Sequence, residues 1–195
     1  MIIKTDRYRH RYTLCEVYRV LLEAIPSIKI LKRVKKDQSF DEAFIERLML
    51  AVTEVNGCSL CSYAHAKMAL ESGFSEEEVS AFFSGSDTFV TPGEAKAILF
   101  AQHYADVQGK VEPEEYERLV AEYGEEAATV ILAAIRGMMA GNVIGLPYSA
   151  IQSRFKGVRY TNSNIFYEIG MSVGSILIIP IVLLHHGVRR IIGKV

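Results

Sequence analysis

The strongest constraint on the fold is a helix signal that stops abruptly just before a pair of cysteines. Apolar residues from Phe44 to Val55 recur at three- and four-residue spacing, which places them on one face of a helix. Asn56-Gly57 then supplies the kind of left-handed residue that ends helices, so a second helix should begin at Cys58. Because most other apolar runs also follow helical spacing, the sequence predicts an all-α fold.

The second helix should carry two thiols and an imidazole on one face. Cys58, Cys61 and His65 fall within an arc of roughly 60° at about 100° per residue. A thiol in the first turn is near the positive end of the peptide dipoles and unpaired amide N–H groups, which stabilise a thiolate. Cysteines in such positions titrate at roughly 3.5 to 7.5. The stretch therefore combines a nucleophile, a partner thiol able to close a disulfide, and a base.

A family resemblance rests on these residues and on one more. The pattern Glu46-x11-Cys58-x2-Cys61-x3-His65, followed by Ala66-Lys67-Met68-Ala69-Leu70-Glu71-Ser72-Gly73, resembles the core motif of the AhpD-like and carboxymuconolactone decarboxylase superfamily. The similarity spans roughly residues 40 to 145. It implies an AhpD-like multi-helix bundle, here with an additional N-terminal helix and a long apolar C-terminal helix.

The resemblance also implies a chemistry. In the alkylhydroperoxidase branch, Cys61 would attack an organic hydroperoxide, Cys58 would resolve the product to a disulfide, and Glu46 and His65 would relay protons. The electrons would come from an external dithiol or a thioredoxin-like reductant, and no cofactor is expected. The well-known peroxidases of this branch have a second histidine between the cysteines, where this chain has Leu60.

Two other functions fit the same residues. Cys58, Cys61 and His65 could bind zinc with Glu46 or His103 as a fourth ligand, although structural zinc sites usually have a second ligand pair, and none is evident here. The chain could instead be a non-catalytic oligomeric interaction protein that retains the motif.

Composition sets the remaining expectations. With 195 residues, the chain should form one all-α domain, with the AhpD-like core at 40–145 and helical extensions at 1–39 and 146–195. The net charge of −1 argues against a nucleic-acid partner. Three cysteines do not make a secreted disulfide framework, and the first residues lack an apolar signal, so a cytoplasmic location is expected. Cys15 is expected to be a buried small hydrophobe.

Capping signals predict the other elements. We expect helices at about 8–24, ending near Pro26, and at 27–35; Asp41 should cap the helix that carries Glu46, and the cysteine helix should end at Gly73. Further helices are expected from Ser75 to Phe83, from Thr91 to Val107, from Glu112-Pro113 to Tyr123, and from Glu125 into the 140s or beyond.

Glycine at 137, 141 and 145 recurs every four residues in the long helix. Each interior glycine costs about 1 kcal/mol relative to alanine, so the repeat predicts close approach of another helix, plausibly the cysteine helix.

The C-terminal region contains no charged residue from Ile169 to Val188, and Arg189-Arg190 follow. This length could cross a membrane. Pro180, the serines and the polar cap at Asn162–Asn164 favour instead a helix in a homo-oligomer interface, with membrane contact through 169–188 as the alternative.

Overall fold

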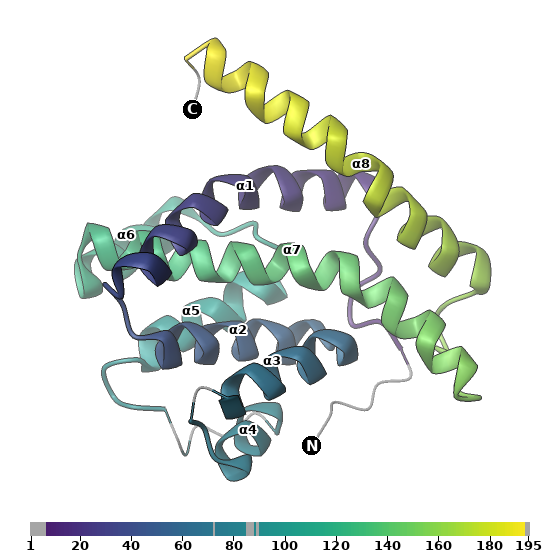
Figure 1. Cartoon of the computed structure of the whole chain (residues 1–195), viewed down its shortest axis with the longest axis horizontal. Coiled ribbons are helices and arrows are strands. Elements are labelled where there is room, and N and C mark those ends of the chain that lie inside the picture. Colours follow the sequence, from purple (N-terminus) through teal and green to yellow (C-terminus); the bar gives the residue numbers. More distant parts are fainter. Residues whose placement is uncertain (1–6, 72, 85–87, 89, 194–195) are drawn as a thin grey trace.

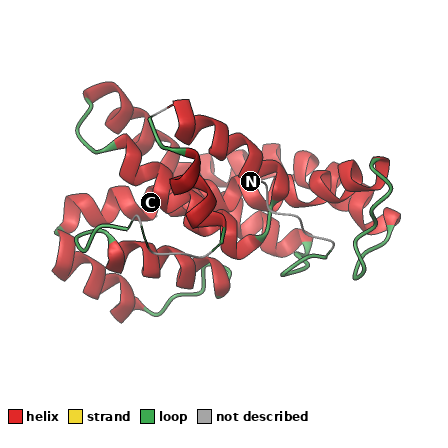
Figure 2. Cartoon of the chain, turned by 90° about the horizontal axis from the view of Figure 1, so that it is seen from below, coloured by secondary structure: helices red, strands yellow, loops and turns green. Residues whose placement is uncertain are grey.

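The structure is a computed structural model, and it describes residues 7–71, 73–84, 88 and 90–193. Every regular element within these ranges is a helix, which confirms the predicted all-α class (Figure 2). The eight helices of the described residues are α1 (Leu14–Asp37), α2 (Glu42–Asn56), α3 (Ser59–Glu71), α4 (Glu76–Phe83), α5 (Ala95–Asp106), α6 (Pro113–Tyr123), α7 (Glu125–Phe155) and α8 (Ile165–Ile191).

Helix α7 is the element around which the others pack. It contacts α1, α2, α3, α5, α6 and α8, and Figure 1 shows α1 and α8 on one side of it and α2 and α3 on the other. Its buried residues run from Ala128 to Ala150 and include Ile131 and Ile135, which are fully buried. The core therefore lies along α7, with the cysteine helix α3 against its second half.

Helix α1 differs from the prediction. It begins at Leu14 behind a Thr13 capping box and continues through Pro26 to Asp37 as one helix, so the expected break near Pro26 is wrong. Proline removes one backbone hydrogen bond and usually kinks a helix. Here Val20 before Pro26 and Val34 after it are both buried, because α1 packs along α7 and α8. Packing on both sides of the proline outweighs its local effect.

Most other helix ends follow their capping signals. The side chain of Asp41 accepts a hydrogen bond from the Ala43 amide, and Ser75 forms the predicted capping box with Glu78. Gly73 follows the end of α3 with a φ of +96°. The exception is α5, which begins at Ala95 instead of at Pro92. The amides of Glu94 and Ala95 donate to the Thr91 carbonyl, so the predicted start is a separate turn.

Two helices, α7 and α8, are long and apolar enough to cross a membrane by length and composition. In the most apolar 18-residue window, 56% of α7 is buried within the molecule but only 28% of α8. The side chain of Asn164 caps α8 through the Tyr167 amide, as expected for this start. Helix α8 thus covers α1 and α7 with one face and leaves the other exposed (Figure 1).

Candidate functional site

The turn between α2 and α3 places Cys58 at the entrance of a helix. Gly57 adopts a φ of +70° and ends α2, and its amide donates a hydrogen bond to the Thr53 carbonyl at 2.9 Å. Helix α3 begins at the next position but one, and the Ser62 amide donates to the Cys58 carbonyl at 2.8 Å. Cys58 is therefore the residue from which α3 starts, as the glycine stop predicted.

The structure brings the two cysteines together as a disulfide. Cys58 and Cys61 are bonded, with their Cα atoms 5.3 Å apart, and the Cys61 amide donates to Cys58 Sγ at 3.3 Å. Cys58 is fully buried, whereas Cys61 remains 8% exposed. Because Cys58 Sγ accepts an amide at the positive end of α3, this position stabilises a thiolate on Cys58. Cys61 is the more accessible of the two sulfurs.

A glycine of α7 allows the disulfide to sit against that helix. A Cβ atom at Gly145 would lie 2.7 Å from Cys61 Sγ and 2.9 Å from Cys58 Sγ, so a side chain there would collide with both sulfurs. The Gly141 carbonyl oxygen lies 3.7 Å from Cys61 Sγ. Gly137 instead faces Leu31 of α1. The expected approach of the cysteine helix is confirmed at Gly145, and the first glycine of the repeat accommodates a different helix.

Ser149 contacts the disulfide, and sequence reasoning missed it. Its Oγ accepts the Leu60 amide at 3.1 Å, donates to the Gly145 carbonyl at 3.0 Å and lies 3.8 Å from Cys58 Sγ. The side chain is buried. The Ser149 hydroxyl, on α7, therefore caps the first turn of α3 by accepting one of its amides. The signal was present in the sequence, because the four-residue repeat of small residues in α7 continues to Ser149.

Glu46 and His65 form a second pair, which joins α2 to α3. His65 Nδ1 and Glu46 Oε2 are 3.0 Å apart, and Glu46 is buried, 8% exposed. The burial of Glu46 shows that its side of α2 faces packed neighbours and not solvent. An ionised carboxylate only accepts hydrogen bonds, so this contact puts a proton on Nδ1 and leaves Nε2 of a neutral ring able to accept another.

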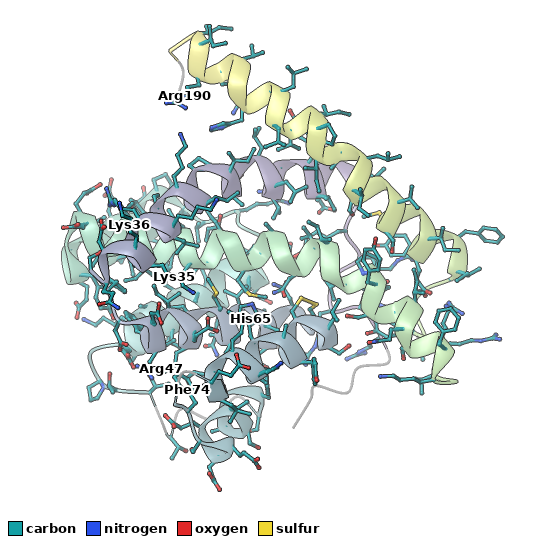
Figure 3. The ribbon with its side chains drawn as sticks, viewed as in Figure 1. Lys35, Lys36, Arg47, His65, Phe74 and Arg190 are labelled. Carbon is teal, nitrogen blue, oxygen red and sulfur yellow. A yellow bond between two sulfur atoms is a disulfide. The ribbon has the colours of Figure 1, made fainter. Side chains whose placement is uncertain are left out.

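The Glu46–His65 pair lines a cavity of about 290 Å³. Its walls come from α1, α2 and α3 and are mostly apolar, with one lysine at the α1 side; Figure 3 labels this lysine and His65. Neither cysteine is among the described residues of the wall. The lining residues are Leu31, Val34, Lys35, Glu42, Ile45, Glu46, Met49, His65 and Met68.

The predicted site residues thus form two pairs. Within the described residues, no hydrogen bond joins His65 to either sulfur, although His65 follows Cys61 by one helical turn, a spacing that puts side chains on the same face. His103 lies elsewhere and pairs with Glu115 at 3.1 Å. In the part of the chain that the structure describes, no group of three or more histidine, cysteine, aspartate or glutamate side chains is placed to hold a metal ion.

Two further single residues differ in their environment. Cys15 is exposed on the first turn of α1, so its predicted burial is wrong; the buried stripe of α1 passes through Val17 and Val20 instead. Glu54, near the end of α2, is half-buried. Burial raises the pKa of its carboxyl, and nearby Arg9 partly opposes this shift.

These features define an all-helical protein in which a C-x-x-C disulfide at the start of one helix adjoins a carboxylate–imidazole pair. Residues 29–103 match the carboxymuconolactone decarboxylase family, in agreement with the resemblance that the motif carries. The chain is also similar to the uncharacterized protein YdfG of Bacillus subtilis (strain 168), with 23% identity over 131 residues, 66% of this chain and 89% of that protein. Gly145 and Ser149 lie outside the segment that the family matches.

Proposed function

We propose that this protein is a thiol-dependent peroxidase that reduces organic hydroperoxides through a Cys58/Cys61 dithiol–disulfide cycle. The observation that carries the proposal is the Cys58–Cys61 disulfide on the same helix as His65, which is held by Glu46 and lines an apolar cavity. The match of residues 29–103 to the carboxymuconolactone decarboxylase family supports the same class of chemistry, since Glu46, Cys58, Cys61 and His65 resemble the motif of its alkylhydroperoxidase branch.

In the oxidative half of the cycle, the Cys61 thiolate attacks the O–O bond of the hydroperoxide. A sulfur–oxygen bond forms as the O–O bond breaks, and Cys61 becomes a sulfenic acid. The alkoxide leaves and takes the proton that the Cys61 thiol gave to His65 Nε2 on ionising, so that an alcohol is released. Glu46 holds the ring in place through Nδ1. The Cys58 thiol then attacks the sulfenic sulfur; the S–S bond forms, the S–O bond breaks, and the hydroxyl takes the Cys58 proton and leaves as water. The greater exposure of Cys61 supports its role as the attacking thiol.

In the reductive half, an external dithiol attacks the more accessible sulfur, Cys61, and Cys58 leaves as a thiolate. Thiol–disulfide exchange is faster when the leaving thiolate is stabilised. Three groups can stabilise Cys58: the dipole at the start of α3, the Cys61 amide and the Ser149 hydroxyl. The second thiol of the reductant then attacks the mixed disulfide and releases Cys61, so the reductant ends as a disulfide and both protein thiols are restored.

The cavity beside His65 indicates the kind of substrate. Its volume of about 290 Å³ and its methionine and aliphatic walls suit a hydroperoxide with an apolar organic body. The need for a dithiol reductant places the cycle in a reducing compartment such as the cytoplasm.

The test uses the pre-reduced protein with cumene hydroperoxide. We expect accelerated loss of the hydroperoxide and an intact mass that falls by two protons as the disulfide forms. Cys61→Ser should abolish both effects. Cys15→Ser is the matched control, because it removes an exposed thiol outside the pair and should leave both unchanged. If the reduced wild-type protein neither speeds hydroperoxide loss nor loses two protons, the proposal is wrong.

One observation favours a non-catalytic role instead, namely the near-complete burial of both sulfurs. Burial in apolar surroundings raises a thiol pKa and makes it inert. Thiol titration separates the two functions, since a peroxidase requires at least one thiol that reacts quickly near neutral pH, whereas a retained motif would give two slow thiols.

A further inference from the structure

The exposed face of α8 is a long apolar feature of the molecular surface that the redox site does not use. Large apolar side chains, each at least 44% exposed, recur along it every three or four residues, from one end of the helix to the other. Soluble monomers rarely expose so long a continuous patch without a binding role. The residues of this face are Phe166, Ile169, Val173, Ile176, Leu177, Ile181, Leu184, Val188 and Ile191.

The charges around this face are almost all positive. No charged residue occurs from Ile169 to Val188. From residue 154 to the last residue, the sequence has six basic residues and one acidic residue, Glu168, which is fully buried and paired with Arg154. The exposed bases flank both ends of the face, and no ion pair between described residues uses them. They are Lys156 and Arg159 before α8 and Arg189 and Arg190 at its end.

We propose that the exposed face of α8 docks on an anionic membrane surface. An apolar helix face with basic residues at its margins inserts its side chains at the boundary between headgroups and acyl chains, and the bases attract anionic lipids. The excess positive charge of this region, in a chain whose net charge is −1, makes the anionic bilayer the complementary partner.

The packing of α8 indicates that it lies on the membrane and does not cross it. Its opposite face belongs to the core: Met171, Ser175 and Val182 are buried, and a Cβ at Gly174 would meet Leu14 of α1 at 2.6 Å. A spanning α8 would expose this face and Glu168 to lipid, and a buried carboxylate without a partner is costly there.

A second copy of the chain fits the face less well. Antiparallel pairing of two α8 helices would bring Arg189 and Arg190 of one copy beside Lys156 and Arg159 of the other, and parallel pairing would place like charges at both ends. Residues 169–195 contain no acidic side chain to neutralise either arrangement. Like charges brought together at an interface oppose association.

Vesicle sedimentation of the full chain tests the proposal. We expect binding to vesicles of phosphatidylcholine with phosphatidylglycerol, weak binding to phosphatidylcholine alone, and loss of binding at high salt. Arg189→Gln with Arg190→Gln should weaken the partition coefficient on the order of tenfold. Lys32→Gln with Lys36→Gln is the matched control, because it removes the same charge from exposed positions of α1 and should have little effect; Figure 3 labels Lys36 and Arg190.

The apolar contribution is tested with Leu177→Ser and Leu184→Ser together. Both side chains are highly exposed, at 67% and 71%, so the fold should survive, as circular dichroism can verify, while vesicle binding is lost. Light scattering without vesicles completes the test. Three results would overturn the proposal. The first is a wild-type dimer that the double variant dissociates. The second is a wild-type monomer that does not bind anionic vesicles, and the third is equal binding to anionic and neutral vesicles.

Discussion

Helices α7 and α8 have similar length and apolar character, yet they occupy opposite environments. Both are long and apolar enough to cross a membrane by length and composition alone, but α7 is packed into the core and α8 presents one face to solvent. Part of the difference lies in their small residues. A side chain at Gly145 of α7 would collide with two sulfurs. In α8, Gly174 is closed by Leu14 of α1, but Gly170 and Gly187 have nothing within 4 Å of the position a Cβ would take. Hydropathy therefore identifies an apolar helix, and small residues placed at contact points determine what packs on it.

The largest contrast should appear when one aliphatic side chain is truncated on each helix. Ile135→Ala in α7 removes a fully buried side chain and should lower the free energy of unfolding by about 2–5 kcal/mol. Leu184→Ala in α8, at 71% exposure, should change it by less than about 0.5 kcal/mol. Guanidinium unfolding measures both. Similar losses in the two variants would mean that α8 is covered in solution and would refute the comparison.

Glycine substitution should give effects of opposite sign. Gly145→Ala places a methyl group against both sulfurs and should destabilise the protein by about 1–3 kcal/mol, despite the better helix propensity of alanine. Gly170→Ala meets open space and should stabilise α8 by up to about 1 kcal/mol. Thermal unfolding of the two variants under identical oxidising conditions is the measurement. A neutral Gly145→Ala would show that α3 and α7 are not in tight contact.

The smallest effect on stability, with a clear chemical readout, should come from the serine that links α7 to Cys58. Ser149→Ala should raise the pKa of the Cys58 thiol and slow reduction of the disulfide by dithiothreitol about three- to tenfold, because the leaving thiolate loses a hydrogen bond. Alkylation rates of Cys58 as a function of pH, followed by mass spectrometry, give the pKa without any peroxide.

Ser62→Ala is the matched control for that experiment. Ser62 is also a buried serine near Cys58, but its hydroxyl donates to the Cys58 carbonyl at 3.0 Å and not to a sulfur. Its removal should leave the thiol pKa unchanged. If the two variants behave alike, the contact between Ser149 and Cys58 Sγ has no chemical role.

The sequence predicted what depends on neighbouring residues. Capping hydrogen bonds join groups only a few positions apart along the chain. They begin or end a helix where expected at Asp41, Gly57, the Ser75–Glu78 box and Asn164. The resemblance assigned Glu46 and His65 to one proton relay, and the structure brings these two side chains to 3.0 Å; their relay role stays a prediction.

What the sequence could not predict depends on partners far along the chain. Pro26 remains inside α1 because α7 and α8 pack on both sides of it, and Cys15 is exposed because the tertiary contacts of α1 use neighbouring positions. Ser149 is 91 positions from Cys58. Ser149 continues the small-residue repeat of α7, which marks a helix contact, but the repeat does not say which distant residue the hydroxyl meets.

The contacts of Ser149 have a spectroscopic consequence. Its oxygen accepts a hydrogen bond from the Leu60 amide. Its single hydrogen can be donated either to the Gly145 carbonyl or to the sulfur of Cys58, but not to both. A thiolate attracts that hydrogen more strongly than a disulfide does. Reduction of the Cys58–Cys61 disulfide should therefore break the hydrogen bond from Ser149 to the Gly145 carbonyl. Carbon-13 at the Gly145 carbonyl would then report, by its infrared stretch, whether the cysteine pair is open or closed.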